Sequence, residues 1–260
     1  PSDALQGQAL SAVVKADMPA DGTVGLIHMT NDYGSGLADS FTAAFTADNS
    51  TLCQILGYEQ IATDFSAAVQ AMIDNGCTTA VLVSYLDSGG MIIDDMAAMG
   101  WSGQVYGGDG LCDTWLAADM SSSVDGVTCT VPRIGMQTSV SLEFISTCLN
   151  NSDCASGIYT AEAYDAMMIM FESYIQSAGG NQLNQQILIT GQYWEGASGW
   201  ITFDSNGDSA GAGFDICEFD ESNGQVSLNC YDTWGGTDPP QDSDNDGWLD
   251  NVEVQCSTNP

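Results

Sequence analysis

Two tyrosines and one aspartate in this sequence have the side-chain chemistry needed to hold a small amine. Tyr33, Tyr85 and Asp109 each lie in a turn that follows a run of residues typical of a β-strand, and Ser84 directly precedes Tyr85. A carboxylate in a partly desolvated cleft stabilises an ammonium group through charge-assisted hydrogen bonds, and aromatic rings add apolar area and cation–π attraction. These residues therefore indicate a site for a zwitterionic or cationic ligand.

The same residues also fit purely structural roles. Tyr33 can pack on its own turn, and Asp109 can cap a helix predicted near residues 113–118. An anionic ligand has few partners in a chain with only two basic residues, apart from backbone N–H groups at helix starts such as Ser88–Gly90. A cationic group on the ligand is the favoured interpretation.

A second chemical pattern lies in the acidic tail, DSDNDGWLDNVE, where oxygen-bearing side chains and Gly247 follow the spacing of an EF-hand calcium loop. The expected Ca²⁺ ligands are the side chains of Asp242, Asp244, Asp246, Asp250 and Glu253 and the backbone carbonyl of Trp248. No second long helix follows, so the tail resembles a thrombospondin type 3 calcium repeat, a module of extracellular stalks. A solvated acidic linker is the alternative.

A shorter acidic stretch imitates the start of such a loop. Asp204, Asn206 and Asp208 have the right spacing, but nothing acidic completes the pattern. We expect a hairpin turn there.

The sequence offers little support for catalysis. It has one histidine and no GxSxG, P-loop or complete dinucleotide-binding motif. An acid pair acting without these motifs is the open alternative. We expect a binding protein that is not an enzyme and uses no organic cofactor.

The charge balance is strongly acidic: 35 Asp and Glu face only Lys15 and Arg133, for a formal net charge of −33. Nucleic acids and anionic lipids need a clustered basic face, so the sequence excludes them as usual partners. The 44 % of hydrophobic residues argues against disorder, and 260 residues suffice for one large or two modest domains. Because such a surface repels itself at low salt, a saline or calcium-containing exterior, as in halophilic-like proteins, fits.

Nine cysteines without a CxxC pair indicate an oxidising, extracytoplasmic compartment. Their positions suggest the pairs Cys53–Cys77, Cys112–Cys129, Cys148–Cys154 and Cys217–Cys230. Eight cysteines allow 105 connectivities, so other pairings stay open, as does the partner of Cys256. Buried free thiols are the alternative. No apolar run approaches the roughly 20 residues of a membrane span and no signal peptide is present, so we expect a mature segment or a fragment.

The first two-thirds of the chain alternate strand and helix patterns. We expect strands at residues 23–29, 52–58, 78–85, 104–107 and 127–131, and helices at residues 4–16, 37–47, 65–74 and 89–99, the third capped by Asp64. This alternation predicts right-handed βαβ units on a parallel sheet, in which ligands bind beyond the carboxyl ends of the strands. That rule selects Tyr33, Ser84–Tyr85 and Asp109.

Beyond Pro132 the pattern changes. Helices are expected at residues 142–149 and 159–177, and strands at residues 200–203 and 214–219 joined by a polar turn. The long helix is apolar nearly all round at Met167, Met168, Ile169, Met170 and Phe171, so we expect it to be buried. A functional methionine cluster is the alternative.

Seven short segments occur in the order found in type I periplasmic binding proteins. They are PSDALQG, NDYGSGLADSF, DFSAAVQAM, VSYLDSGG, YGGDGL, YTAEAYDA and ITFDSNGD, spread over about residues 1–231. The sequence most resembles the Leu/Ile/Val-type receptors of ABC transporters. The resemblance implies an α/β fold with Rossmann-like parallel sheets in two lobes, joined by three crossovers, that close on a ligand.

The resemblance also implies a division of the chain. Residues 1–130 and 196–232 resemble the second lobe, and residues 131–195 resemble a segment returning to the first lobe. On this match the chain begins at the first crossover, and we therefore expect most of the first lobe to be absent. Residues 233–260 form the acidic calcium-repeat linker.

Matched to the family's pocket, Tyr33 and Tyr85 correspond to aromatic residues of the cleft wall, and Asp109 corresponds to the acidic residue that pairs with the ligand's ammonium. Asp3 is a weaker candidate at the crossover. Ser84 is also a candidate ligand-binding residue, because it lies in the same turn as Tyr85. The groups that bind the ligand's carboxylate belong to the absent lobe.

The resemblance implies an extracytoplasmic solute receptor that captures an amino acid or a related small amine or amide for an ABC permease. One alternative is the ligand-binding ectodomain of a sensory receptor with its own membrane domain. Another is a calcium-dependent surface or adhesion protein that uses the fold structurally.

Overall fold

The computed structural model describes residues 2–114, 116, 121–133, 138–151, 154, 159–209, 211 and 213–236. The predicted calcium loop at residues 242–253 and Cys256 lie outside the described residues. The chain divides into two compact units. Unit 1 comprises Pro1–Pro132 with Phe214–Gly235, and unit 2 includes Arg133–Gly213.

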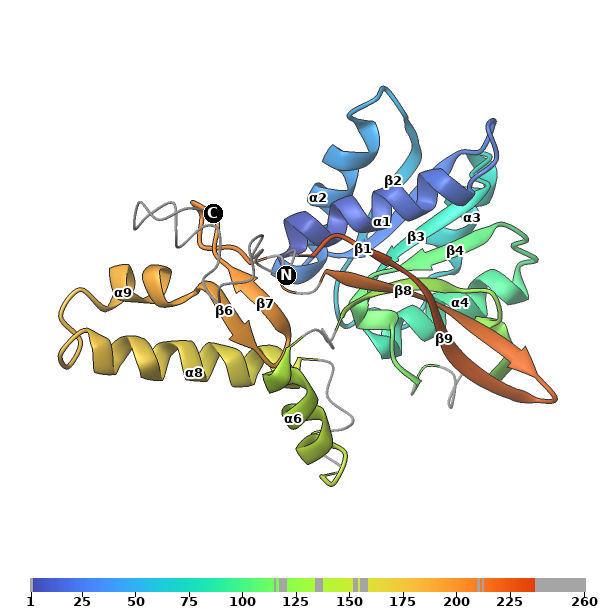
Figure 1. Ribbon diagram of the computed structural model, residues 1–260. Helices are drawn as coiled ribbons and strands as arrows, with labels where there is room; N and C mark the ends of the chain where they lie inside the picture. The colour runs from blue at the N-terminus through green and yellow to red at the C-terminus, as the bar shows by residue number, and fades with distance from the viewer. Residues whose placement is uncertain are drawn as a thin grey trace. The chain divides into compact units, whose positions relative to one another are not determined.

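Unit 1 is built on a seven-stranded sheet in the order β2-β1-β3-β4-β5-β8-β9. The first five of these strands are parallel, β8 is antiparallel to β5, and β9 forms a hairpin with β8 (Figure 1). The strands are β1 (Val24–Met29), β2 (Leu52–Tyr58), β3 (Thr79–Val83), β4 (Gln104–Gly107), β5 (Thr128–Pro132), β8 (Phe214–Ser222) and β9 (Gln225–Trp234).

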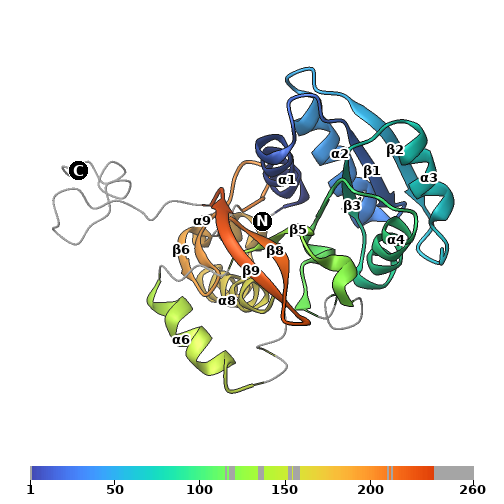
Figure 2. The same ribbon diagram turned by 90° about the vertical axis from the view of Figure 1, so that its right-hand side faces the viewer.

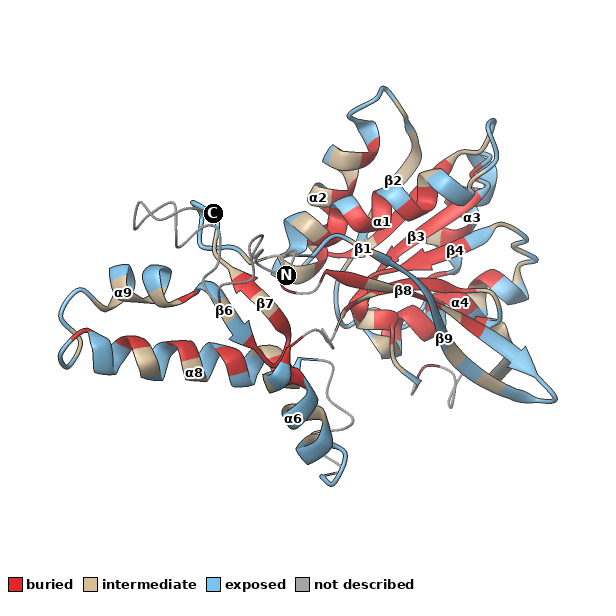
Figure 3. Cartoon of the chain, in the orientation of Figure 1, coloured by how far each residue is buried: buried red, intermediate tan, exposed pale blue. Residues whose placement is uncertain are grey.

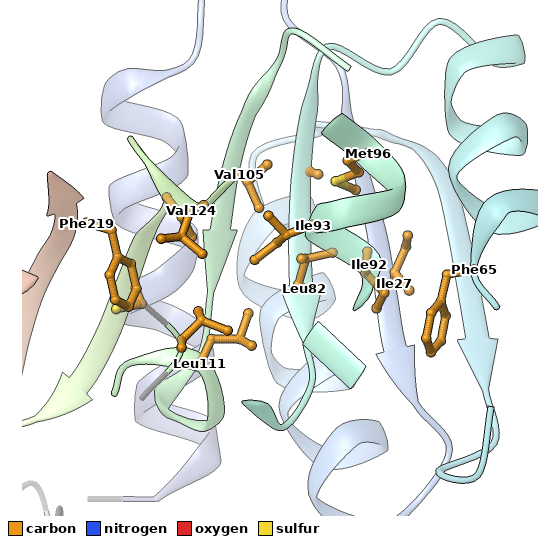
Figure 4. Packing of buried hydrophobic residues seen from close by; sticks show 14 of the residues in the cluster. Ile27, Phe65, Leu82, Ile92, Ile93, Met96, Val105, Leu111, Val124 and Phe219 are labelled. Carbon is orange, nitrogen blue, oxygen red and sulfur yellow. The ribbon is translucent and has the colours of Figure 1, made fainter. Parts of the chain in front are cut away.

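Helices cover both faces of this sheet (Figure 2). They are α1 (Asp3–Asp17), α2 (Asp32–Thr46), α3 (Ser66–Asp74) and α4 (Leu86–Ala98), with short 3-10 helices η1 (Asp109–Leu111) and η2 (Ser121–Val124). Side chains alternate across a strand, so Leu26 packs with α1 and α2 whereas Ile27 packs with α3 and α4. Figure 4 shows the second of these cores, in which Ile27 and Phe65 lie beside Leu82 and Ile92.

The strand order reverses between β1 and β3. The connection through α2 leads from β1 to β2 on one side, and the connection through α3 returns to β3 on the other side of β1. In open parallel sheets such a reversal leaves a crevice beyond the carboxyl ends of the two flanking strands. The fold therefore gives a specific place to look for a ligand site.

The five predicted parallel strands of unit 1 are confirmed to within two residues at each end, whereas β8 runs three residues further than predicted, to Ser222. Helices α2 and α4 begin at least three residues earlier than predicted. The segment expected to be a turn, residues 31–36, is the cap and first turn of α2, because the Asn31 side chain accepts a hydrogen bond from the Gly34 N–H at 2.7 Å. Likewise α4 begins at Leu86, directly after Tyr85. The Asp64 side chain accepts a hydrogen bond from the Ser66 N–H, but Phe65 occupies the cap position of α3.

All four suggested disulfides are confirmed: Cys53–Cys77, Cys112–Cys129, Cys148–Cys154 and Cys217–Cys230. The alternative of buried free thiols is therefore wrong for these eight cysteines. Three of the residues stand in register on neighbouring strands, with Cys129 of β5 opposite Cys217 of β8, and Cys217 opposite Cys230 of β9. The β8–β9 hairpin turns at Asn223-Gly224, and both residues have positive φ, as a two-residue hairpin requires.

Unit 2 contains three described helices and one hairpin. They are α6 (Ser139–Cys148), α8 (Thr160–Gln176), α9 (Leu183–Thr190), β6 (Gln192–Gly196) and β7 (Gly199–Thr202). The Asp165 carboxylate fastens α8 to the hairpin, because it accepts hydrogen bonds from the N–H groups of Ala197 and Ser198 at 2.7 and 2.8 Å and from the Ser198 hydroxyl at 2.7 Å.

The predicted connection from residues 200–203 to residues 214–219 is wrong as a strand pair. Strand β7 pairs with β6, whereas β8 pairs with β5 and β9 in unit 1. The hairpin turn predicted at Asp204 is confirmed, because Phe203 and Ser209 form an antiparallel bridge across it and the Asp204 carboxylate accepts hydrogen bonds from the N–H groups of Asn206 and Asp208.

The predicted burial of α8 is also wrong. Met167 is 62 % exposed and Phe171 59 % exposed, and Met170 is exposed as well; only Ile169 of the five apolar residues is buried. Tyr164, Met167, Phe171 and Tyr174 recur every three or four residues and form one outward stripe, the apolar stripe of α8, visible as pale blue along the helix in Figure 3. Of the acidic residues of α8, Asp165 is instead buried. An ordinary surface helix buries its apolar side chains and exposes its polar ones, whereas α8 exposes an apolar stripe and buries a carboxylate.

Candidate functional site

Tyr33 lies in the first turn of α2, directly after β1. The first turn of α2 packs closely against the end of β1: a Cβ at Gly34 would lie 2.1 Å from the carbonyl oxygen of Met29. Only glycine fits at that point. The close start fixes the Tyr33 side chain at the carboxyl edge of the sheet.

Tyr85 occupies the cap position of α4, directly after β3. Its ring stacks on that of Tyr33, with the centroids 5.2 Å apart and the planes 8° from parallel. The two residues therefore belong to the two loops that flank the reversal of strand order. Tyr85 is 42 % exposed, so the pair offers aromatic surface to solvent.

Asp109 opens η1, directly after β4, and is only 7 % exposed. The Tyr33 hydroxyl donates a hydrogen bond to Oδ1 of Asp109 at 3.0 Å and accepts one from the Gly110 N–H at 3.2 Å. A Cβ at Gly110 would lie 2.4 Å from the Ser84 carbonyl oxygen and 3.0 Å from the Tyr33 hydroxyl. The three loops thus meet so closely that glycine is required, and the structure brings Tyr33, Tyr85 and Asp109 together.

Asp3 lies in the first turn of α1, and its Oδ2 atom is 3.1 Å from the place of a Cβ on Gly36, in the second turn of α2. Partial burial of the carboxyl, followed by the negative charge of Asp109, raises the pKa of Asp3. The two carboxyl groups therefore repel each other when both are charged. A cation placed near them would relieve this repulsion.

Ser84 has a different environment from the other candidates. It is fully buried, and its Oγ accepts a hydrogen bond from the Tyr58 hydroxyl at 2.8 Å. Its hydroxyl is thus engaged inside the protein next to the site. Tyr58 was missed by the sequence analysis, although it ends β2 and the rule that selected the other candidates applies to it.

In the part of the chain that the structure describes, no group of three or more His, Cys, Asp or Glu side chains is arranged so that it could hold a metal ion. The proposed ligands of the tail, Asp242 to Glu253, lie outside that part. Among the described helices, none has the length and apolar character needed to cross a bilayer.

No family model matches the sequence. It is 26 % identical over 222 residues to the Leu/Ile/Val-binding protein homolog 3 of Brucella melitensis, and 19 % identical over 217 residues to a leucine-, isoleucine-, valine-, threonine- and alanine-binding protein of Pseudomonas aeruginosa. Each alignment covers 84 % of this chain. The chain spans 60 % and 58 % of the length of these two curated relatives.

Solved structures give the fold. A periplasmic binding protein type 1 from Bordetella pertussis matches 89 % of this chain with a TM-score of 0.75 at 14 % identity, covering 66 % of its own length. The chain has the type I periplasmic-binding-protein fold. The leucine-binding protein LivK of Thermotoga maritima, with the same fold, matches 88 % of the chain and 65 % of its own length with a TM-score of 0.72 at 20 % identity. The predicted fold class is confirmed, with a mainly parallel sheet covered by helices.

Proposed function

We propose that this chain is the ligand-binding part of an extracytoplasmic solute receptor that captures an amino acid or a related small amine or amide. The observation that carries the proposal is the junction of Tyr33, Tyr85 and Asp109 at the carboxyl edge of the sheet, where the strand order reverses. Capture by such a site needs no bond to be broken, so the proposed role is binding and not catalysis.

The chemistry of the site supports a ligand that carries an ammonium group. A carboxylate that is almost fully buried interacts strongly with a cation, and a hydrogen bond to a charged group contributes about 1.5–3 kcal/mol. The exposed Tyr85 ring, backed by Tyr33, adds apolar area and cation–π attraction. Asp3 adds a second negative charge nearby.

The charge of the site supports an amino acid over the other ligand class found among similar structures. A LivJ protein of Streptococcus pneumoniae was solved with isoleucine, whereas a solute-binding protein of Rhodopseudomonas palustris was solved with 4-hydroxybenzoate. The second ligand is an anion and would be repelled by Asp3 and Asp109. The acidic site therefore favours a zwitterion such as an amino acid.

The exposed face of unit 2 supports a two-lobed receptor. A helix with an uncharged, apolar outer stripe is stable in water only when another layer covers it, and a two-stranded hairpin is marginal by itself. We propose that unit 1 is the second lobe of the receptor and that unit 2 belongs to a first lobe whose sheet is not among the described residues. An ABC permease is the proposed partner that receives the ligand after the lobes close.

The test is titration of the purified chain with a panel of amino acids and with 4-hydroxybenzoate, followed by NMR for weak binding. We expect at least one amino acid to bind and 4-hydroxybenzoate not to bind. Asp109→Asn keeps an acceptor for the Tyr33 hydroxyl but removes the charge, and should weaken binding about 10- to 100-fold. Asp39→Asn, on the exposed side of α2, changes the net charge equally and should have no effect. Binding of no amino acid, or equal effects of the two variants, would contradict the proposal.

A further inference from the structure

Tyr58, at the end of β2, contacts both of the loops that carry the stacked tyrosines. Its hydroxyl donates a hydrogen bond to Ser84 Oγ at 2.8 Å and lies 2.8 Å from Ser88 Oγ. Its backbone carbonyl accepts hydrogen bonds from the N–H and the hydroxyl of Thr30, at 2.9 and 3.1 Å. One residue thus joins the loop after β1 to the loop after β3.

The hydroxyl contacts are placed where they control the backbone of Tyr85. Ser84 precedes Tyr85, and Ser88 Oγ donates to the Tyr85 carbonyl oxygen at 3.4 Å, beside the Gly89 N–H that donates to it at 2.8 Å. The Tyr58 hydroxyl therefore connects the residue before Tyr85 with the first turn of α4. On the other side, Thr30 precedes Asn31, whose side chain caps α2 two residues before Tyr33.

The two serine partners of the Tyr58 hydroxyl are shielded from water. Ser84 and Ser88 are buried, so water does not replace the lost contacts freely. The Tyr58 ring packs edge-on against Phe65 of the core, with the centroids 4.9 Å apart and the planes at 82°. Burial raises the pKa of the Tyr58 hydroxyl, which keeps its proton for donation to Ser84 at neutral pH.

We propose that Tyr58 is a positioning residue that holds the rings of Tyr33 and Tyr85 in their stacked arrangement and thereby sets the affinity of the site. Tyr58 acts through the two loops and need not contact the ligand. The part of this inference that concerns affinity rests on the proposed function, whereas the part that concerns the tyrosine pair does not.

The first test needs no ligand. The stacked pair should give a coupled near-ultraviolet circular dichroism signal that is lost in Tyr85→Leu. Tyr58→Phe removes only the hydroxyl oxygen. It should change this signal more when Tyr85 is present than when Tyr85 is already replaced by Leu, because only the first protein has a stacked pair to disturb. Tyr106→Phe is the matched control, because Tyr106 also donates its hydroxyl to a side chain, Asp17, at the opposite edge of the same sheet. The Tyr106→Phe change should be the same in both backgrounds.

The second test uses the amino acid that binds most tightly in the panel above. Tyr58→Phe should weaken its binding about three- to tenfold, and Tyr106→Phe should leave it unchanged. Ser88→Ala removes the other contact of the hydroxyl and should act like Tyr58→Phe, which guards against a folding defect of a single variant. If the Tyr58→Phe signal change is equal in both backgrounds, Tyr58 has no positioning role. If no amino acid binds but the signal changes differ, the proposed function fails while the positioning of the pair stands.

Discussion

The buried carboxylate of Asp165 provides a sharp test of how unit 2 is held together. Asp165 is 1 % exposed and accepts three hydrogen bonds from the tight turn between β6 and β7. The packing leaves no room for adjustment, because a Cβ at Gly196 would lie 2.4 Å from Oδ2 of Asp165. Asp165→Ala leaves the N–H groups of Ala197 and Ser198 buried without an acceptor.

Each buried donor left without an acceptor costs about 1–3 kcal/mol. Two such N–H groups, with the Ser198 hydroxyl free to turn to another acceptor, give an expected loss of about 3–5 kcal/mol in the free energy of unfolding. Urea unfolding of both proteins measures this difference. Hydrogen exchange at the amides of Ala197 and Ser198 should accelerate in parallel, because local opening of the hairpin exposes them.

Asp204 supplies the matched control. Its carboxylate also accepts hydrogen bonds from two backbone N–H groups, at 2.8 and 2.9 Å, but it is exposed. Water can replace the carboxylate there, so Asp204→Ala should cost less than about 1 kcal/mol. Equal losses in the two variants would refute the argument that burial, and not the number of hydrogen bonds, makes Asp165 important.

Other predictions concern charge, exposure, disulfides and calcium. Both carboxylate oxygens of Glu162 are buried with no hydrogen-bond partner among the described residues, and this burial raises the pKa of Glu162. The contribution of Glu162 to the free energy of unfolding therefore falls as the pH rises through that pKa. In urea unfolding, Glu162→Gln should be more stable than the original chain at pH 7 but not at pH 4. Phe171→Glu, on the apolar stripe of α8, should reduce binding of a hydrophobic dye, whereas Ile61→Glu at an isolated exposed position should not. Replacing Cys112 and Cys129 by Ala should weaken amino-acid binding through the loop of Asp109, more than the same change at Cys148 and Cys154. In the tail, Ca²⁺ should alter Trp248 fluorescence, and Glu253→Gln should abolish the response.

Each of these outcomes has a clear opposite. A Glu162→Gln gain that is equal at the two pH values would contradict the burial of an ionised carboxylate. Unchanged dye binding in Phe171→Glu would mean that the stripe is already covered. Equal effects of the two disulfide changes would remove any special role of the bond next to Asp109. A fluorescence response that survives in Glu253→Gln would leave the tail as an acidic linker.

The parallel sheet could be predicted from the sequence because each strand is a short run of β-branched and other apolar residues between turns. The start of α2 could not, because a turn-like segment that contains two glycines also fits a helix when Asn31 caps it. Tyr33, Tyr85 and Asp109 were selected because they follow strands, and the structure places them side by side. Tyr58 ends the predicted strand 52–58 just as Tyr85 ends the predicted strand 78–85, but none of the seven segments that carry the resemblance contains Tyr58.

The errors in unit 2 have a different cause. The apolar run in α8 predicts burial, but Met167, Met170 and Phe171 are exposed among the described residues, because a run of apolar residues does not specify which segment packs against it. The partner of β7 was also wrong, because local alternation predicts a strand but not its neighbour. Contacts between distant segments are the information that a single sequence lacks.

The row of cysteines across β5, β8 and β9 has a consequence for biosynthesis. Cys129 and Cys217 face each other as directly as Cys217 and Cys230 do, so pairing of β5 with β8 brings together two thiols that are not bonded in the final protein. If these two sulfurs oxidise first, Cys112 and Cys230 are left without their partners. Correct pairing therefore requires that Cys112–Cys129 or Cys217–Cys230 forms before β5 pairs with β8, or that an isomerase exchanges the wrong bond for the right ones.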